Sequence, residues 1–349
     1  MSQPSEHPVV AVVILNWNGI SYLERFLPFL NRSTYPNLKL YVADNGSTDD
    51  SVNWLQTHHP HIQVLTSKTN RGFAGGYNWA ISQLNEELLV LLNSDIEVDP
   101  GWIEPVVQLF NQHQDVAAIQ PKIMDFHRRD HFEYAGAAGG WMDRLGYPFS
   151  RGRVFDVLEK DHGQYDTIRE IFWASGAAMF IRKSAFNQAG GFDEFFFAHQ
   201  EEIDLCWRMQ RLGWRLLVCP QSLVYHIGGG TLPKDNPRKV FLNFRNNLIM
   251  LYKNLSLAEA CWILPGRFAL DAISAYKNLF SMQSSYFFAV MRSHFAFLGW
   301  MLFHQKRSVR LPANNTEVAL KGLYQGSIVW QHFIRGKNSF SEIVSSLNG

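Results

Sequence analysis

A short apolar run from Leu88 to Leu92 ends abruptly in a polar cluster that contains Asp95, and this stretch constrains the fold more than any other. An unbroken run of this length is typical of a buried strand in a sheet that is covered on both faces. Open α/β sheets bind ligands beyond the carboxyl ends of their strands, where a carboxylate can hold a divalent cation against a diphosphate. Asn, Ser and Asp also favour turns for local reasons, so this stretch alone does not separate a metal site from a turn.

The N-terminal half alternates strand-like and helix-like patterns, which predicts βαβ units and a mainly parallel sheet with helices on both faces. The expected strands are 9–15, 38–43, 62–66, 88–92 and 116–121, and the expected helices are 22–30, 51–56, 74–84 and 100–110, the last with Pro100 in its first turn. Residues 125–170 lose this rhythm, and we expect loops and short strands over a cleft there. Regular patterns return at 171–181, 184–189, 201–212, 215–218 and 223–226.

The length of 349 residues and a shift in charge predict two domains. Residues 1–233 carry 18 Lys/Arg and 26 Asp/Glu, a net charge of −8, whereas residues 234–349 carry 14 and 5, a net charge of +9. Pro233 and Pro237 bracket the boundary. We therefore expect an α/β domain over 1–232 that holds the ligand sites, followed by an α-helical region over 233–349.

The helical region is basic and also rich in aromatic and aliphatic residues, which favours an anionic membrane surface over nucleic acid as its partner. Tyr286–Phe303 is apolar except for Arg292, Ser293 and His294. This pattern favours amphipathic helices lying in the membrane interface over a spanning helix. Packing on the α/β core, with a role in a homodimer, is the alternative.

The three cysteines, Cys206, Cys219 and Cys261, lack metal-ligand spacing and cannot all form disulfides, which indicates a reducing compartment. The N-terminus shows no basic-then-apolar signal segment. We expect a cytoplasmic protein, and peripheral attachment to the inner face of the plasma membrane is the accompanying hypothesis.

Polar side chains follow three expected strands, and the carboxyl ends of those strands lie at one edge of the sheet. Asn16 and Asn18 follow the first strand, Asp44 ends the second, and Asp95 follows the fourth. Asp44 could accept hydrogen bonds from a base N–H or a ribose hydroxyl. The glycine-rich loop 70–76 would let its backbone approach a nucleotide closely, but it matches neither a Walker sequence nor Gly-x-Gly-x-x-Gly.

A second polar cluster begins the expected helix at Glu201. Glu201, Asp204 and Arg208 fall on one helical face, with Glu202 beside them in the first turn. An acidic first turn is stabilised by the helix dipole whether or not it does chemistry. Acidic groups beside the three phenylalanines at 195–197 also suit a pocket wall, where a carboxylate can act as general base towards a hydroxyl.

His226 follows an apolar strand and precedes Gly228–Gly230, so it is either a structural histidine or a ligand beneath a mobile loop.

These segments resemble the successive sequence blocks of family 2 glycosyltransferases, and most closely the rhamnosyltransferase-like branch. The blocks run in order through residues 8–250. They are 12–19, 42–49, 70–76, 91–95, 173–179, 190–194, 201–205 and 226–230. The resemblance implies a GT-A fold, a Rossmann-like and mainly parallel sheet flanked by helices. It also implies a nucleotide-diphosphate sugar donor, a divalent cation (Mg²⁺ or Mn²⁺) and inversion at the anomeric carbon.

The resemblance assigns roles residue by residue. Asp95 and His226 would hold the metal, with Asn93 standing where the family motif often has a first Asp. Glu202 would be the catalytic base, one methylene longer than the usual Asp, with Glu201 and Asp204 as further candidates. Apart from the resemblance, Trp173 could stack on an apolar face of the acceptor sugar, although core packing is the commoner role of such aromatic residues. The residues expected to contact the donor are Asn16, Asn18, Asp44, Asn70, Gly72, Gly75, Asn93 and Ser94.

The function that follows is transfer of rhamnose or a related hexose to a hydroxyl of a saccharide or lipid-linked saccharide in cell-surface polysaccharide synthesis. One alternative is a non-catalytic protein that binds nucleotide-sugars or saccharides. Another is a nucleotidyltransferase, which would require a basic, glycine-rich triphosphate loop after the first strand. Residues 16–19 are not such a loop.

Overall fold

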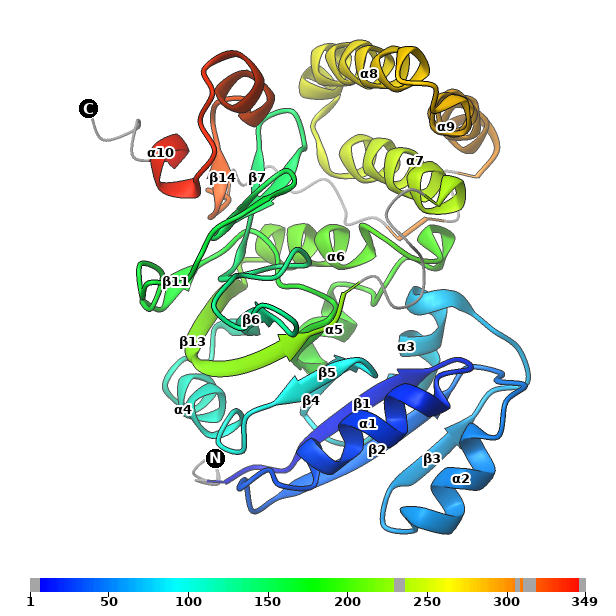
Figure 1. Ribbon diagram of the computed structural model, residues 1–349, viewed down its shortest axis with the longest axis vertical. Helices are drawn as coiled ribbons and strands as arrows, with labels where there is room; N and C mark the ends of the chain where they lie inside the picture. Colours follow the sequence, from blue (N-terminus) through cyan, green and yellow to red (C-terminus); the bar gives the residue numbers. More distant parts are fainter. Residues whose placement is uncertain (1–6, 229–235, 305–307, 310–317, 345–349) are drawn as a thin grey trace.

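The core of the molecule is a nine-stranded sheet with helices on both faces (Figure 1). The computed structural model describes residues 7–228, 236–304, 308–309 and 318–344. The strands follow the order β11-β13-β6-β12-β4-β1-β2-β3, and β5 pairs with β13. Their bounds are β1 Val10–Asn16, β2 Leu38–Asp44, β3 Gln63–Thr66, β4 Leu88–Asn93, β5 Ile96–Val98, β6 Val116–Asp125, β11 Arg169–Glu170, β12 Ala178–Arg182 and β13 Arg215–His226.

The sheet is parallel on one side and mixed on the other. Strands β4, β1, β2 and β3 are parallel, so their carboxyl ends share one edge, as expected. Strand β12 is antiparallel to both β4 and β6, while β13 is parallel to β6. The edge that carries Asn16, Asp44 and Asn93 is therefore built entirely by the parallel side.

Helices cover both faces, which explains why the strands are continuously apolar. In β1, Ala11 and Val13 belong to one buried cluster and Val10, Val12 and Ile14 to the other. The helices of the first face are α3 Gly72–Ser82, α5 Lys183–Gln188 and α6 Glu201–Arg211, and those of the second are α1 Ile20–Leu30, α2 Ser51–His58 and α4 Glu104–Gln112. Successive strand residues face opposite sides, so both sets must be apolar.

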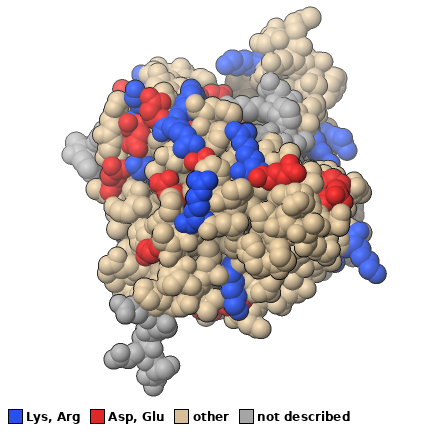
Figure 2. All heavy atoms as spheres, turned by 60° about the horizontal axis from the view of Figure 1, so that its bottom comes forward, with Lys and Arg blue, Asp and Glu red and all other residues tan. Residues whose placement is uncertain are grey.

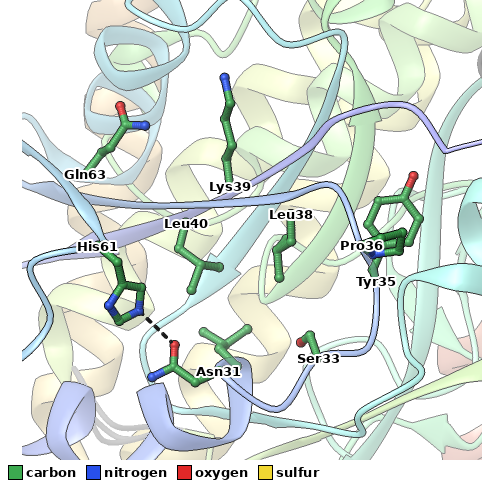
Figure 3. Close-up of a pocket in the computed structure, with 10 residues that line it drawn as sticks. Asn31, Ser33, Tyr35, Pro36, Leu38, Lys39, Leu40, His61 and Gln63 are labelled. Atoms are coloured by element: carbon green, nitrogen blue, oxygen red, sulfur yellow. Dashed lines mark hydrogen bonds between the residues drawn. The ribbon is translucent and has the colours of Figure 1, made fainter.

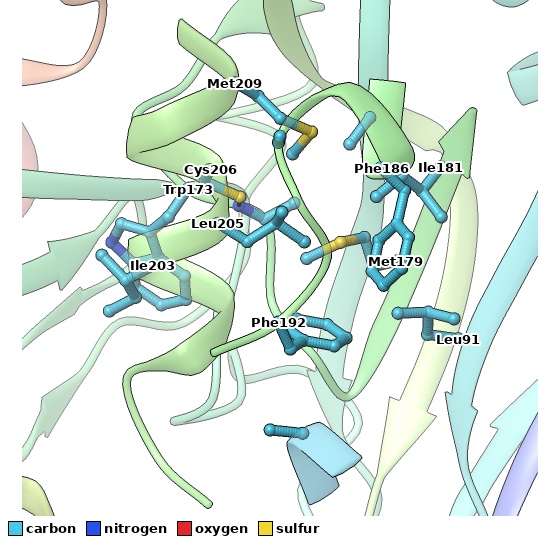
Figure 4. Close-up of a cluster of buried hydrophobic side chains, with 14 of the residues drawn as sticks. Leu91, Trp173, Met179, Ile181, Phe186, Phe192, Ile203, Leu205, Cys206 and Met209 are labelled. Carbon is cyan, nitrogen blue, oxygen red and sulfur yellow. Dashed lines mark hydrogen bonds between the residues drawn. The ribbon is translucent and has the colours of Figure 1, made fainter. Parts of the chain in front are cut away.

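Helix α6 packs its apolar residues onto the sheet (Figure 4). Ile203, Leu205 and Met209 belong to the same cluster as Met179 and Ile181 of β12. Cys206 is also buried in this cluster. This packing fixes the start of α6, where Glu201 and Glu202 lie.

Three expected boundaries are wrong for identifiable reasons. The expected helix over 100–110 begins at Glu104, and Pro105 instead of Pro100 lies in its first turn. The strands expected at 215–218 and 223–226 form the single strand β13, whose register shifts between Cys219 and Leu223. The regular segment expected over 171–181 becomes a strand only at Ala178, because Ser175 and its neighbours form a turn.

Residues 125–170 contain loops and four short strands of a second, five-stranded sheet, which confirms the expectation of loops and short strands. Its order is β10-β9-β8-β7-β14. The bounds are β7 Gly140–Asp143, β8 Pro148–Ser150, β9 Arg153–Val154, β10 Val157–Leu158 and β14 Leu323–Tyr324. Strand β14 comes from the C-terminal region and is parallel to β7. The C-terminal region is therefore joined to the α/β domain through a sheet as well as through helices.

The described C-terminal residues are mainly helical, as expected. The elements are α7 Pro237–Asn254, α8 Leu257–Phe280, α9 Ser284–Phe303, a π-helix Trp330–Ile334 and α10 Phe340–Val344. Helix α7 contacts α6 on one side and α8 and α9 on the other, so α8 and α9 form an outer layer (Figure 1). The expected domain boundary near 233 lies outside the described residues.

Candidate active site

The carboxyl ends of β1 and β2 are joined by hydrogen bonds between polar side chains. Asn16 Nδ2 donates to Asp44 Oδ1 at 3.1 Å and to Ser47 Oγ at 3.2 Å. Asp44 Oδ2 accepts from the Ser47 main-chain N–H at 3.1 Å. Asn16 Oδ1 is buried and has no hydrogen-bond partner within the described residues. Both residues are therefore held rigidly, and one acceptor oxygen is left for a ligand.

Asn18 fixes the loop that follows β2. Its Oδ1 accepts hydrogen bonds from the main-chain N–H groups of Thr48 at 2.7 Å and Asp49 at 3.3 Å. Its own φ is +51°, a left-handed conformation that Asn tolerates better than most residues. The structure thus uses the Asn18 side chain to shape the loop, and its contact with a donor stays a prediction.

The loop between β3 and α3 is tied to the end of β2 by Asn45, a member of the expected polar group after β2 that had no role assigned to it. Asn45 Nδ2 donates to Asn70 Oδ1 at 3.2 Å and to the Gly72 carbonyl at 3.0 Å. Asn45 Oδ1 accepts from the Arg71 N–H at 3.0 Å. Asn70 Oδ1 also accepts from the Gly72 N–H at 2.8 Å. The two loops expected to bind the donor therefore form one connected unit.

Gly72 allows protein backbone to approach it, which differs from the role expected for this loop. Its φ is +70°, and a Cβ there would lie 2.5 Å from the Phe197 carbonyl oxygen. That oxygen accepts from the Phe73 N–H at 2.7 Å. A Cβ at Gly75 would lie 3.1 Å from Arg71 Cβ. Phe197 thus occupies the close approach at Gly72, and donor contact by Gly72 or Gly75 stays a prediction.

Asp95 and His226 meet at the end of β4, as the sequence predicted. His226 Nε2 lies 3.2 Å from Asp95 Oδ1, and both side chains are buried. His226 Nδ1 forms an ion pair with Glu133 Oε2 at 3.3 Å. Asn93 and Ser94 lie directly before Asp95 and are half-buried. The imidazole therefore lies between two carboxylates.

The electrostatics of this group favour charge on Asp95 and His226. Burial alone would lower the pKa of His226, but the carboxylates of Glu133 and Asp95 raise it well above its usual value. Burial alone would raise the pKa of Asp95, but the charge and hydrogen bond of His226 lower it. The charged imidazole of His226 therefore balances the carboxylates of Asp95 and Glu133 at the position proposed for the metal.

The donor set fits a divalent ion that is shared with a ligand. Carboxylate oxygen and neutral imidazole nitrogen are common ligands of divalent metals, so an ion that binds between these two atoms would displace the proton from His226 Nε2. No group of three or more His, Cys, Asp or Glu with metal-site geometry occurs in the described parts of the chain. Asp95 and His226 therefore suit an ion whose other positions are filled by diphosphate and water.

The segment before α6 has an unusual backbone. Phe197, His199 and Gln200 have φ values of +64°, +72° and +73°. Positive φ costs about 1–2 kcal/mol for a residue with a Cβ, so surrounding contacts must hold this segment in place. Gln200 is the N-cap of α6, and Glu201 and Glu202 follow it directly. The strained segment thus sets the position of the acidic pair.

Glu201 is buried and Glu202 is half-buried, and each has a buried carboxyl oxygen with unused hydrogen-bonding capacity. Glu201 Oε2 and Glu202 Oε2 have no hydrogen-bond partner within the described residues. Burial raises the pKa of Glu202 to about 7, and burial together with the neighbouring Glu202 charge raises the pKa of Glu201 well above its usual value. A carboxyl group that titrates near neutral pH is suited to proton transfer.

The turn at residues 175–177 joins the acidic pair to the end of β4. A Cβ at Gly176 would lie 3.8 Å from Glu202 Cβ. The Ala177 carbonyl accepts from the Asn93 N–H at 2.9 Å, two residues before Asp95. The expected catalytic and metal-binding groups therefore border one turn.

Asp204 is not suited to the role of base, which corrects one of the three candidates. It is fully buried, and its Oδ2 pairs with Arg208 at 2.9 Å and with Lys253 at 3.0 Å. Its Oδ1 accepts from Asn254 Nδ2 at 2.8 Å. Burial opposes ionisation, but these partners outweigh it and lower the pKa of Asp204. Asp204 anchors α7 to α6.

Trp173 packs in the core, which corrects its expected contact with the acceptor. Its side chain is in the cluster of Figure 4 and is only 3% exposed. Its indole N–H donates to the Trp141 carbonyl at 2.9 Å, and Gly140 lies against the ring. An acceptor sugar has no access to a ring held in this way.

The sequence also missed Glu133 and Asn246. Glu133 falls in the irregular segment before the second sheet, so only its position beside His226 in space reveals it. Asn246 lies in α7 and donates its amide to three carbonyls of the strained segment. Neither residue belongs to a recognisable local pattern, and no sequence signal would have identified them.

A separate hollow of about 600 Å³ lies at the opposite ends of the strands (Figure 3). Leu38, Lys39 and Leu40 at the start of β2 line it, and His61 bonds to Asn31 Oδ1 at 3.2 Å. Its lining residues include no Asp or Glu. It is remote from the strand ends that carry Asp44 and Asp95.

Two solved structures show the fold. A crystal structure of GalNAc-T7 with UDP, GalNAc and Mn²⁺ matches with a TM-score of 0.57 and 16% identity, covering 70% of this chain and 48% of that one. The chain thus spans about half the length of that protein. The mannosyltransferase PcManGT from Pyrobaculum calidifontis, in complex with GDP-Man and Mn²⁺, matches with a TM-score of 0.52 and 14% identity, covering 87% and 89%. The α/β domain has the GT-A fold.

Proteins with similar sequences are also named as glycosyltransferases. The N-acetylglucosaminyl-diphospho-decaprenol L-rhamnosyltransferase of Mycobacterium tuberculosis is 27% identical over 295 residues, covering 79% of this chain and 94% of that protein. The low-salt glycan biosynthesis hexosyltransferase Agl10 of Haloferax volcanii is 28% identical over 220 residues, covering 60% and 65%. The model of glycosyl transferase family 2 matches residues 11–188, just over half of the chain. With this match and the GT-A fold, the chain belongs to glycosyl transferase family 2.

Proposed function

We propose that this glycosyltransferase is metal-dependent and inverting, and that it moves rhamnose or a related hexose from a nucleotide-diphosphate donor to a hydroxyl of a saccharide or lipid-linked saccharide. The observation that carries the proposal is the pair of neighbouring carboxyl groups, Glu201 and Glu202, each with a buried and unpartnered oxygen within the described residues, beside the turn that leads to Asp95. The names of the rhamnosyltransferase and hexosyltransferase relatives support the sugar class. The Mn²⁺ complexes of the structural relatives support a divalent cation.

The donor would lie along the carboxyl ends of β1, β2 and β4. Asp44 and the free Asn16 Oδ1 supply acceptors for the nucleoside, in a cluster that hydrogen bonds already hold rigid. Asp95 and His226 would hold the cation against the diphosphate. When bound, the cation would neutralise the charge that develops on the leaving nucleoside diphosphate.

Glu202 would act as the base. Its carboxylate accepts the proton of the acceptor hydroxyl while that oxygen bonds to the anomeric carbon, and the bond from this carbon to the diphosphate oxygen breaks on the opposite face. The single displacement, through an oxocarbenium-like state, inverts the configuration of the sugar. The pKa of Glu202, raised by burial to about 7, makes its carboxylate a stronger base than an exposed one.

The experiment measures thermal stabilisation and nucleoside diphosphate release with a panel of nucleotide-diphosphate sugars, with and without Mn²⁺. Ligands that bind the folded state raise its stability by mass action. The proposal predicts that at least one donor stabilises the protein only with Mn²⁺ and releases nucleoside diphosphate when saccharide is added. Stabilisation without any release across the panel would instead indicate a non-catalytic nucleotide-sugar-binding protein.

A further inference from the structure

The outward side of helices α8 and α9 is apolar and exposed. On α8, Ile273 is 66% exposed and Phe280 is 84% exposed, and helical spacing places the exposed Trp262 and Tyr276 on the same side of the helix. On α9, the exposed residues Phe288, Phe295, Leu298 and Leu302 recur at helical spacing. We call the exposed apolar residues of α8, α9 and the π-helix the outer face. Its π-helix residues are Trp330, Phe333 and Ile334.

The opposite side of each helix packs against other parts of the protein. Val290, Phe297 and Trp300 of α9 are buried in the core clusters. Ser293 is fully buried, and His294 Nε2 lies 3.6 Å from Asp271 Oδ2 of α8. Within the described residues, Ser284–Phe303 is the one helix long and apolar enough, by length and composition, to cross a membrane. Because this helix is packed on one side, only a stripe of it is free to meet lipid.

The charges around the outer face are mostly positive. Residues 236–304 and 318–344 contain ten Lys or Arg and three Asp or Glu; Lys253, Arg267 and Asp271 are buried, which leaves eight basic and two acidic residues. Lys277, Arg292 and Arg335 are exposed beside the apolar residues, and Lys277 lies 5.4 Å from the Phe333 ring. By contrast, acidic and basic side chains are interleaved on the face shown in Figure 2.

We propose that the outer face docks the protein on an anionic lipid bilayer, with α8 and α9 lying in the plane of the interface. Apolar side chains would insert at the level of the acyl-chain boundary, and the basic side chains would contact anionic head groups. A second copy of the chain is a poorer occupant, because it would bring the same positive charges face to face.

Docking in this orientation would bring the acidic pair near an acceptor that is itself held in the bilayer. This consequence rests on the proposed function. Helix α7 lies between the outer face and α6, which carries Glu201 and Glu202. Packed helices lie about 8–10 Å apart, so the acidic pair would be roughly 20 Å from the lipid surface. The docking itself does not depend on any step of sugar transfer.

The test is flotation of the full-length protein with vesicles of phosphatidylcholine alone or with 30% phosphatidylglycerol. The variant I273E/F280E/F295E changes only exposed residues of the outer face, and Ile168→Glu, at an exposed apolar residue on the α/β domain, is the matched control. We expect wild type and Ile168→Glu to bind anionic vesicles, and the triple variant to bind at least roughly tenfold more weakly. The variant K277E/R335E should lose the preference for anionic lipid. Thermal melting verifies that each variant is folded.

A fluorophore on Cys261 gives an independent readout. Cys261 is exposed on α8 beside Trp262, whereas Cys206 and Cys219 are buried. The emission of an environment-sensitive label at this position should shift to shorter wavelength when anionic vesicles are added.

The proposal is overturned if wild type does not bind these vesicles, or if the triple variant binds them equally well. It is also overturned if sedimentation shows a dimer that the triple variant dissociates, because a second copy would then cover the outer face. None of these readouts requires sugar transfer, so they fail or succeed independently of the proposed function.

Discussion

Asn246 of helix α7 donates a hydrogen bond from its side-chain amide to the main-chain carbonyl of His199 at 2.7 Å. His199 lies two residues before Glu201, the first residue of the acidic pair. The same amide reaches the carbonyls of Phe196 at 3.0 Å and Ala198 at 2.9 Å. Arg245, next to it, donates to the carbonyls of Phe195 and Phe196. A helix from the C-terminal region thus holds the strained backbone that positions the acidic pair.

Replacing Asn246 by Ala should therefore reduce both stability and turnover. Asn246 is fully buried, and its removal leaves carbonyls of the strained segment without a donor, at a cost of about 1–3 kcal/mol. Chemical denaturation measures this loss, and kcat for sugar transfer should fall more than KM for the donor changes. Asn243→Ala is the matched control, because among the described residues the Asn243 side chain bonds within α7, to the Lys239 carbonyl. An equal loss of kcat in Asn243→Ala would contradict a positioning role for Asn246.

Gly72→Ala tests the close approach between the α3 start and Phe197. A Cβ at this position would lie 2.5 Å from the Phe197 carbonyl oxygen, at a φ of +70°. The conformational cost alone is about 1–2 kcal/mol, and the clash adds to it. Denaturation should show a loss above this value, with weaker donor binding. Gly101→Ala, which has no atom within 4 Å of the added Cβ, should change neither quantity.

The Asp95–His226 pair should account for metal binding. Calorimetric titration of Mn²⁺ in the presence of a nucleoside diphosphate should show binding to wild type and a loss of at least roughly tenfold in Asp95→Asn. Asp99→Asn is the control, since Asp99 lies on the same segment but makes no ion pair with His226. Glu133→Gln should weaken binding less than Asp95→Asn, because Glu133 contacts the imidazole from its far side. Unchanged Mn²⁺ affinity in Asp95→Asn would contradict the assignment.

The pKa shifts of Glu201 and Glu202 predict a pH dependence of stability. Both folded-state pKa values lie above the ordinary value of 4.5, so the folded state binds more protons than the unfolded state between these limits. The contribution of the pair to stability therefore falls as pH rises from about 4.5 through about 7. The stability difference between E201Q/E202Q and wild type should grow in favour of the variant over this range. Denaturation midpoints at pH 5 and pH 8 measure it, and a difference that shrinks with rising pH would contradict the buried, charged pair.

The strands on the parallel side of the sheet could be predicted because each one is marked by a continuous stretch of the sequence. Apolar runs such as Leu88–Asn93 must be buried on both faces, and polar residues after each run mark the carboxyl edge. Asp95 and His226 were found for the same reason, together with the resemblance to the family. Their contact confirms that the two strand ends meet.

The parts that could not be predicted depend on contacts between distant segments. The sequence allows Trp173 either to stack on a sugar or to pack in the core, and its burial follows from Gly140 and Trp141, more than 30 positions away. Asp204 shares a helix face with Glu201, but Lys253 and Asn254 of α7 neutralise it. The register shift in β13 arises from its pairing with β6, which the local pattern does not encode.

Sugar transfer by Glu202→Gln tests the central claim most directly. The donor is the nucleotide-diphosphate sugar that gives the largest Mn²⁺-dependent thermal stabilisation of wild type. We predict that Glu202→Gln binds this donor and Mn²⁺ within about threefold of wild type, because the amide preserves shape, while transfer falls at least roughly 100-fold, because the amide cannot accept the proton. Transfer by Glu202→Gln at a rate within tenfold of wild type would contradict the account.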